Sequence, residues 1–136
     1  MTRTLTFIDS GLLILAARGT DALSNRAMQV LDDPNREFAT SAFVRLEVLP
    51  KAEYNGQVTE AEFYKTFFEA ASAVVPVTGE LVAQAEEEAE HAGLSAMDAL
   101  HIAAAREAGC SELVTAEKST KPIFRVAGIT VTTIRP

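Results

Sequence analysis

Residues 5–17 read LTFIDSGLLILAA, and this stretch decides the fold class. The run Leu5–Ile8 is short and mostly apolar, as expected of a buried strand. Asp9 ends that run, and Ser10–Ala17 then carries apolar residues at helical spacing. A buried strand that leads directly into a helix is the unit from which α/β domains are built.

The same alternation continues along the rest of the chain, divided by glycines, prolines and capping residues. The predicted helices are 22–31, 41–49 (ending before Pro50), 59–71, 78–93 and 95–109, and the further predicted strands are 37–40, 73–77, 112–115 and 129–134. Strands that alternate with helices favour an α/β fold with a mainly parallel sheet. We therefore expect one domain over residues 1–136, with a five-stranded sheet flanked by helices.

Two local signals refine these elements. Thr59 and Glu62 have the spacing of a capping box at the start of the 59–71 helix. Pro76 cannot donate a hydrogen bond to a sheet ladder. The strand at 73–77 should therefore lie at an edge of the sheet.

The composition is that of a globular protein. Apolar residues make up 48% of the chain and charged residues 23%, and no run approaches the ~20 apolar residues that a bilayer requires. The net charge of −7 argues against broad, non-specific nucleic-acid binding, although a metal ion in an acidic site inverts the local potential. Cys110 is the single cysteine and cannot form an internal disulfide. We expect a cytoplasmic protein that is not associated with membranes.

Four acidic residues fall where the chain leaves a predicted strand or enters the next helix. Asp9 follows the first strand directly, and Glu117 lies two residues beyond the fourth. Glu47 lies about two turns into the helix after the second strand, and Asp98 is in the first turn of a later helix. In open parallel sheets, ligands bind outside the carboxyl ends of the strands. We therefore expect the four carboxylates to meet at that edge.

Such a set of carboxylates suits a metal ion. Without a cation the charges repel, and one or more of the acids must take up a proton. Oxygen-rich sites favour Mg²⁺ or Mn²⁺ over softer metals. One or two such ions can activate a water and stabilise the charge on a phosphodiester during in-line displacement. This chemistry needs no nucleophilic side chain, and the sequence offers no obvious catalytic triad.

Each acid also has a structural interpretation. Asp9 is placed to cap the helix that follows it. Asp98 completes a Ser-x-x-Asp capping pattern with Ser95. Glu47 and Glu117, taken singly, suit a solvated helix face and a loop. The functional interpretation depends on all four acids lying at one sheet edge.

Four blocks of sequence resemble the defining motifs of PIN domains. They are Phe7-Ile8-Asp9-Ser10-Gly11, Thr40-Ser41-x5-Glu47, Ser95-Ala96-Met97-Asp98-Ala99-Leu100-His101-Ile102-Ala103 and Leu113-Val114-Thr115-Ala116-Glu117-Lys118. The blocks span nearly the whole chain in the family's order, and they are most similar to those of VapC-type toxins of prokaryotic toxin–antitoxin pairs. The resemblance implies a five-stranded parallel sheet between helices and a Mg²⁺- or Mn²⁺-dependent endoribonuclease.

The resemblance also assigns roles by position. Asp9, Glu47 and Asp98 match the three acids that hold the metal and carry catalysis. Glu117 matches the fourth, where the family usually has Asp, and its extra methylene gives the carboxylate a longer reach. The expected products carry a 5′-phosphate and a 3′-hydroxyl. The implied supporting residues are Ser10 and Thr115, and the candidate RNA-binding residues are Lys118, Lys121 and Arg125.

The implied partners are RNA, a cognate antitoxin and a second copy of the chain. The basic residues after the fourth strand are equally consistent with binding the RNA backbone and with a solvated loop or a partner contact. The acidic run 86–90 suits a solvated face, or a surface for basic residues of an antitoxin. Five aromatics between residues 54 and 68 exceed what one buried stripe needs, which favours an added interface.

Specific residues count against other interpretations of the sequence. His101 is expected to pack locally rather than to act in catalysis. Haloacid-dehalogenase-like enzymes need a second Asp where this chain has Gly11, and receiver domains need an Asp where it has Thr78-Gly79. The remaining alternative is a catalytically weakened PIN-like interaction module, which only the Glu at position 117 favours.

Overall fold

The sheet has five parallel strands, and its first strand lies at the centre. The computed structural model of the protein describes residues 2–136. The strands are β1 (Thr4–Ile8), β2 (Arg36–Ser41), β3 (Ala73–Val75), β4 (Glu112–Thr115) and β5 (Thr130–Thr133). Their order is β3-β2-β1-β4-β5, and each neighbouring pair is parallel. The predicted α/β class and the five-stranded parallel sheet are confirmed.

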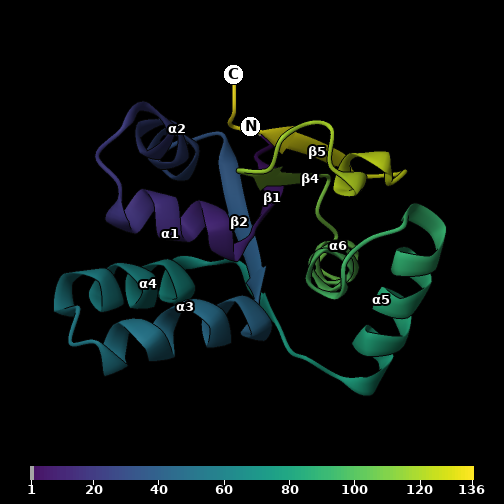
Figure 1. Cartoon of the computed structure of the whole chain (residues 1–136), viewed down its shortest axis with the longest axis horizontal. Coiled ribbons are helices and arrows are strands. Elements are labelled where there is room, and N and C mark those ends of the chain that lie inside the picture. The colour runs from purple at the N-terminus through teal and green to yellow at the C-terminus, as the bar shows by residue number, and fades with distance from the viewer. Residues whose placement is uncertain (1) are drawn as a thin grey trace.

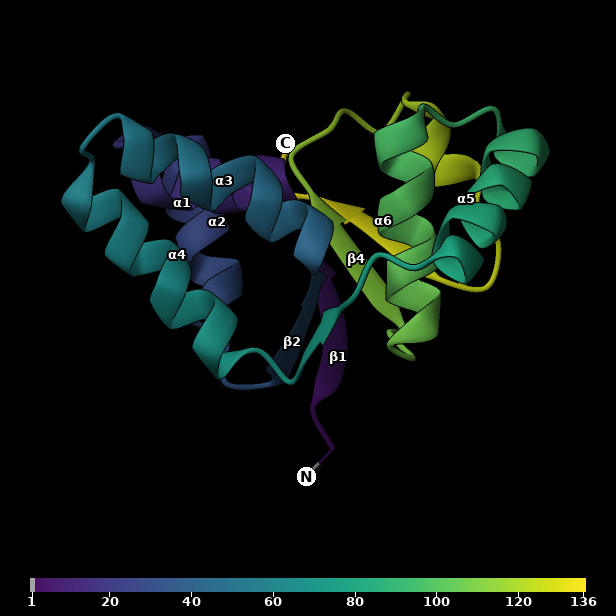
Figure 2. The same ribbon diagram turned by 90° about the horizontal axis from the view of Figure 1, so that it is seen from below.

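Helices cover both faces of this sheet. They are α1 (Ser10–Arg18), α2 (Ala22–Leu31), α3 (Ala42–Tyr54), α4 (Val58–Ala70), α5 (Gly79–Ala92) and α6 (Ala96–Glu107), with a 3₁₀ helix at Pro122–Arg125. Figures 1 and 2 show α1 to α4 on one side of the sheet and α5 and α6 on the other. Within residues 2–136, no helix is both long and apolar enough to cross a bilayer.

The core lies between the central strands and the alanine-rich helix α6. Phe7 and Ile8 of β1 are fully buried, as are Leu113 and Val114 of β4. Each such side chain contributes roughly 1.5–3 kcal/mol when it leaves water. The buried alanines of α6 let that helix approach both the sheet and α5 closely, and they are Ala99, Ala103, Ala104 and Ala105. This packing fixes the position of the first turn of α6.

Side-chain caps set the points at which strands turn into helices. Asp9 accepts a hydrogen bond from the N–H of Leu12 at 2.9 Å, and Ser41 accepts one from Val44 at 3.1 Å. Each cap satisfies an N–H that a helix start leaves without a partner. Because these caps are the first residues after β1 or the last of β2, the helices begin directly at the carboxyl edge of the sheet.

Several predicted boundaries were wrong. Helix α3 continues through Pro50 to Tyr54, because proline removes only one intrahelical hydrogen bond and the fully buried Ala52 keeps the next turn packed. Helix α4 begins at Val58 after Gly56, so Thr59 lies inside the first turn and the capping box does not form. Strand β3 stops before Pro76, and its predicted edge position is confirmed.

Some of the aromatic and acidic residues predicted to form surfaces are buried, and others are exposed. Tyr64 and Phe68 are buried, while Tyr54 is 90% exposed. The acidic run 86–90 was expected to be a solvated face, which is wrong for Glu88. This side chain is buried and pairs with Arg106, because it lies on the face of α5 that packs against α6.

Candidate active site

The chain order of the strands creates a crevice at the carboxyl edge of the sheet. From β1 the chain moves to β2 and β3 on one side, and it later returns to β4 and β5 on the other (Figure 1). Ligands of open parallel sheets bind at such a reversal. An open pocket of about 430 Å³ lies there, which we call the acid pocket. Its lining residues are Asp9, Ser10, Gly11, Leu15, Glu47, Met97, Asp98, His101, Thr115, Ala116, Glu117 and Arg135.

Asp9 is the most buried of the four acids. It is 8% exposed, and its Oδ1 caps α1 through the N–H of Leu12. Burial raises the pKa of Asp9, and the negative charge of Asp98 adds to this effect. The charge of His101 and the hydrogen bonds from Leu12 and Thr115 act in the opposite direction. The Asp9 carboxylate therefore does both: it caps α1 and it lines the acid pocket.

Asp98 enters the pocket from the first turn of α6. Its backbone N–H donates to Ser95 Oγ at 3.2 Å, which is the cap expected at this helix start. Burial raises the pKa of Asp98, and the nearby charge of Glu117 raises it further. His101 and Lys121 oppose these effects. A bound cation would therefore stabilise the ionised form of this acid.

Glu47 reaches the pocket from α3 and is held by Ser10. The Ser10 hydroxyl donates a hydrogen bond to Glu47 Oε1 and thereby links the first turn of α1 to α3. Ser10 itself is buried, whereas Glu47 is exposed. A fixed hydroxyl thus limits the rotamers of a side chain that is otherwise free to turn into solvent.

Glu117 lies on a loop that the end of the chain braces. Its N–H donates to the buried hydroxyl of Thr115 at 3.1 Å. Its carbonyl accepts from the hydroxyl of Thr133, and the carbonyl of Thr115 accepts from the N–H of Ile134 at 3.0 Å. The backbone of the loop is therefore fixed on both sides, while the Glu117 side chain is exposed.

His101 lines the acid pocket, which the sequence did not predict. It is 5% exposed and packs against Phe7, with 5.8 Å between ring centroids, so the expected local packing is confirmed. It also lines the acid pocket, and its Nδ1 is buried without a hydrogen-bond partner in the described part of the chain. The signal in the sequence is the spacing, because residues three apart share a helix face and Asp98 precedes His101 by three.

The donors in the pocket fit a hard divalent cation. Carboxylate oxygens are the ligands that Mg²⁺ and Mn²⁺ prefer. The raised pKa values of Asp9 and Asp98 both signal negative charge held in a poorly solvated place. Across residues 2–136, however, no three Asp, Glu, His or Cys side chains are close enough together to hold one ion. The exposed side chains of Glu47 and Glu117 would have to turn inward to complete such a site.

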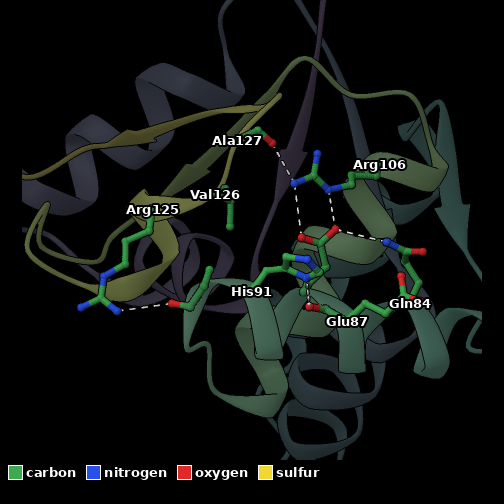
Figure 3. A pocket seen from close by; sticks show the side chains of 9 residues that line it. Gln84, Glu87, His91, Arg106, Arg125, Val126 and Ala127 are labelled. Carbon is green, nitrogen blue, oxygen red and sulfur yellow. Dashed lines mark hydrogen bonds and ion pairs between the residues drawn. The ribbon is translucent and has the colours of Figure 1, made fainter.

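The predicted RNA-binding residues separate into two places. Lys118 and Lys121 are exposed on the segment that follows Glu117, and the charge of Lys121 acts on Asp98. Arg125 instead lines a second pocket of about 510 Å³ between α5, α6 and the 3₁₀ helix, where it donates to the carbonyl of Ala92 (Figure 3). Arg135 was not among the predicted RNA-binding residues, but it lines the acid pocket itself.

The link between Ser10 and Glu47 can be tested by Ser10→Ala. We expect about a 10- to 100-fold loss of metal affinity, the usual cost of removing a group that orients a ligand. Mn²⁺ binding by calorimetry measures this loss. Ser24→Ala is the matched control, because the buried Ser24 hydroxyl has no partner within residues 2–136 and should leave the affinity unchanged. Equal affinities in both variants would contradict a role for the Ser10 hydroxyl.

A profile of the PIN domain family matches residues 6–127. The protein belongs to the PIN domain family. The match contains the four motifs identified in the sequence, so the predicted family is confirmed. A search of curated protein sequences found no match.

Solved structures share the fold of this PIN domain at low sequence identity. A toxin–antitoxin complex from Klebsiella pneumoniae has 19% identity and a TM-score of 0.74 over 96% of this chain and 98% of that one. VapBC2 from Rickettsia felis, bound to a DNA fragment from its promoter, has 15% identity and a TM-score of 0.69 over 96% and 98%. VapC20 from Mycobacterium tuberculosis, a Sarcin-Ricin loop cleaving toxin, has 21% identity and a TM-score of 0.62 over 79% and 86%. The expected likeness to VapC-type PIN domains is therefore confirmed for the fold.

Proposed function

We propose that this PIN domain is a metal-dependent endoribonuclease and the toxin of a type II toxin–antitoxin pair. The observation that carries the proposal is that four separate segments each bring one acid to the same pocket, at the reversal of strand order. Nuclease activity is further supported by the fold shared with VapC20, a Sarcin-Ricin loop cleaving toxin.

The acids would have distinct tasks in this reaction. Mg²⁺ or Mn²⁺, when bound, supplies an activated water and stabilises negative charge on the phosphate. Asp9 is the fixed point of the site, since its cap on α1 leaves it little freedom. Asp98 comes from the packed start of α6, while Ser10 orients Glu47. Glu117 provides the adaptable fourth carboxylate.

The remaining residues would exclude water and guide the substrate. His101 and Thr115 form the buried floor of the pocket, where the local dielectric is low and charges interact strongly. Hydrolysis by in-line attack of a water would leave a 5′-phosphate and a 3′-hydroxyl. Lys118 and Lys121, both exposed and close in sequence to Glu117, would contact the RNA backbone next to the acids.

A cognate antitoxin and a second copy of the chain are the proposed protein partners. The Klebsiella pneumoniae and Rickettsia felis structures with this fold are toxin–antitoxin assemblies, which supports an antitoxin partner. Leu46, Tyr54 and Val58 on α3 and α4 are 66%, 90% and 72% exposed, which suits apolar contacts with a partner. A toxin that cleaves RNA would act in the cytoplasm, where its substrate and its antitoxin are made.

One observation favours a second candidate, a PIN-like interaction module with a weakened site. The four acids share a pocket, but across residues 2–136 no three of the possible ligands are close enough for one ion. The Glu at position 117 is also longer than the Asp usual in this family. Under this alternative, the domain would bind its partners without cleaving RNA.

A thermal titration with Mn²⁺ separates the two candidates. Ligands that bind only the folded state raise the melting temperature as their concentration increases. We expect a rise of a few degrees with Mn²⁺ and, on a mixture of structured cellular RNAs, cleavage that EDTA abolishes. Metal-independent melting together with intact RNA would support the interaction module. Ca²⁺ serves as the comparison, because it prefers longer bonds and more oxygen ligands than Mg²⁺ does.

A further inference from the structure

Among residues 2–136, Arg135 is the only lysine or arginine that lines the acid pocket. The protein has a net charge of −7, and four of its carboxylates are gathered in this pocket. Such a field repels the phosphates of RNA, so a nuclease needs local positive charge where the strand enters. Arg135 is exposed, and it lies two residues beyond the end of β5.

The guanidinium of Arg135 is anchored at one atom. Its Nε donates to the carbonyl of Ala116, next to Glu117. Its backbone N–H donates to the hydroxyl of Thr133 at 3.0 Å, and that hydroxyl in turn donates to the carbonyl of Glu117. These contacts hold the arginine and the loop of the fourth acid together as one unit.

The rest of the guanidinium has no partner in the described part of the chain. Within residues 2–136, its two η nitrogens donate no hydrogen bond, and no carboxylate lies within ion-pair distance of Arg135. By contrast, Arg18, Arg36 and Arg106 are all paired with carboxylates. A free pair of η nitrogens on a fixed guanidinium matches the two oxygens of a phosphate.

We propose that Arg135 binds an RNA phosphate at the mouth of the acid pocket, through its two η nitrogens. The inference rests on the proposed ribonuclease function and adds a substrate-binding residue to it. The phosphate would lie beside the loop that carries Glu117. Arg135 would thereby offset the repulsion between the carboxylates and the strand.

The competing role for Arg135 is structural. Its bond to Ala116 braces the Glu117 loop, and losing that brace would also lower activity. RNA affinity measured against salt separates the two roles, because each phosphate contact to a single strand adds about 0.7 to the slope of log affinity against log salt. A lost brace leaves that slope unchanged.

The test uses the full chain with Asp98→Asn, so that bound RNA stays intact. Binding of a short, labelled single-stranded RNA of random sequence is measured by fluorescence anisotropy at several salt concentrations and fixed Mg²⁺. Arg135→Gln should weaken binding about tenfold, the usual value of a hydrogen-bonded charge, and should lower the salt slope by about 0.7. Arg135→Lys keeps the charge and should keep the slope, with an intermediate affinity.

Arg26→Gln is the matched control. Arg26 is also exposed and also donates to the carbonyl of a residue in the C-terminal segment, Ile134, at 3.1 Å. It lines a different pocket, so its loss removes the same charge and the same kind of brace without removing a phosphate contact. Affinity and slope should both stay within twofold of the Asp98→Asn parent.

The outcomes distinguish this inference from the function on which it rests. Equal affinity and slope for Arg135→Gln and the parent would overturn the role of Arg135, even if the wild type cleaves RNA. Equal losses in Arg26→Gln and Arg135→Gln would also overturn it, since total charge alone would then explain the binding. A wild type that neither binds nor cleaves RNA would overturn the proposed function and, with it, this inference. Melting curves confirm that each variant is folded.

Discussion

Asp98→Asn should abolish the Mn²⁺-dependent rise in melting temperature and lower RNA cleavage about a thousandfold, or ~4 kcal/mol of transition-state stabilisation. Asparagine keeps the size of the side chain and the cap at Ser95, which uses the backbone N–H. It removes one negative charge from the donors in the acid pocket. The measurements are melting curves against Mn²⁺ and cleavage rates under identical conditions. A variant that still gains stability with Mn²⁺ would place the metal elsewhere.

The same substitution should have the opposite effect on the metal-free protein. Burial raises the pKa of Asp98 above its ordinary value of 3.8, so the folded state holds this proton more tightly than the unfolded chain. Ionised Asp98 therefore costs stability as the pH rises from 3.8 through the raised pKa, and the cost is complete above it. Asparagine has no charge to desolvate. With EDTA present, we expect Asp98→Asn to melt a few degrees above wild type at neutral pH.

The pH dependence of the stability difference tests whether desolvation of the Asp98 charge is its cause. The difference between Asp98→Asn and wild type should shrink as the pH falls toward 3.8, where both states of the wild type become protonated. Asp21→Asn should behave in the reverse way. The hydrogen bond from the backbone N–H of Ser24 lowers the pKa of Asp21, so its charge adds stability that is present above 3.8 and lost as the pH falls below it. A metal-free Asp98→Asn protein that is less stable than wild type at neutral pH would contradict the burial argument.

Arg106→Leu should lower the free energy of unfolding by about 3 kcal/mol, the lower end of the cost of breaking a buried ion pair. The Glu88 side chain is 9% exposed, and both Nε and Nη2 of Arg106 donate to its carboxylate. Nη2 also donates to the carbonyl of Ala127 at 2.8 Å, as Figure 3 shows. Leucine would leave the buried Glu88 charge without its cation, with the Gln84 amide still donating to Oε2 at 3.3 Å. Urea denaturation of the metal-free protein measures the loss.

Two further variants identify the cause of that loss. Lys65→Leu breaks exposed pairs with Glu53 and Glu62 and should cost less than about 1 kcal/mol. The double variant Glu88→Leu/Arg106→Leu should recover most of the stability, because it removes the charge together with its partner. If the double variant is as unstable as Arg106→Leu, packing rather than the unpaired charge is responsible.

Local sequence patterns were sufficient to predict the helices and strands, but not to predict where all of them end. Apolar period and caps identify a strand or helix from neighbouring residues alone, and so the starts at Ser41, Thr78 and Ser95 were predicted correctly. The end of α3 could not be predicted, because the helix passes Pro50 with its next turn packed through the buried Ala52, and that burial depends on the tertiary fold. Glu88 was misjudged for the same reason, since its partner lies on α6.

The sequence by itself determined the alternation of strands and helices, the PIN family and the placement of four acids after strands or at helix starts. These depend on short-range order along the chain, which periodicity and motif spacing record. Three features were decided only by the tertiary structure. Ser10 donates to Glu47, Arg125 lines a different pocket, and Arg135 lies beside the acids. Arg135 reaches Ala116 because β4 and β5 pair in register, with Thr115 opposite Thr133, and no local pattern encodes that pairing.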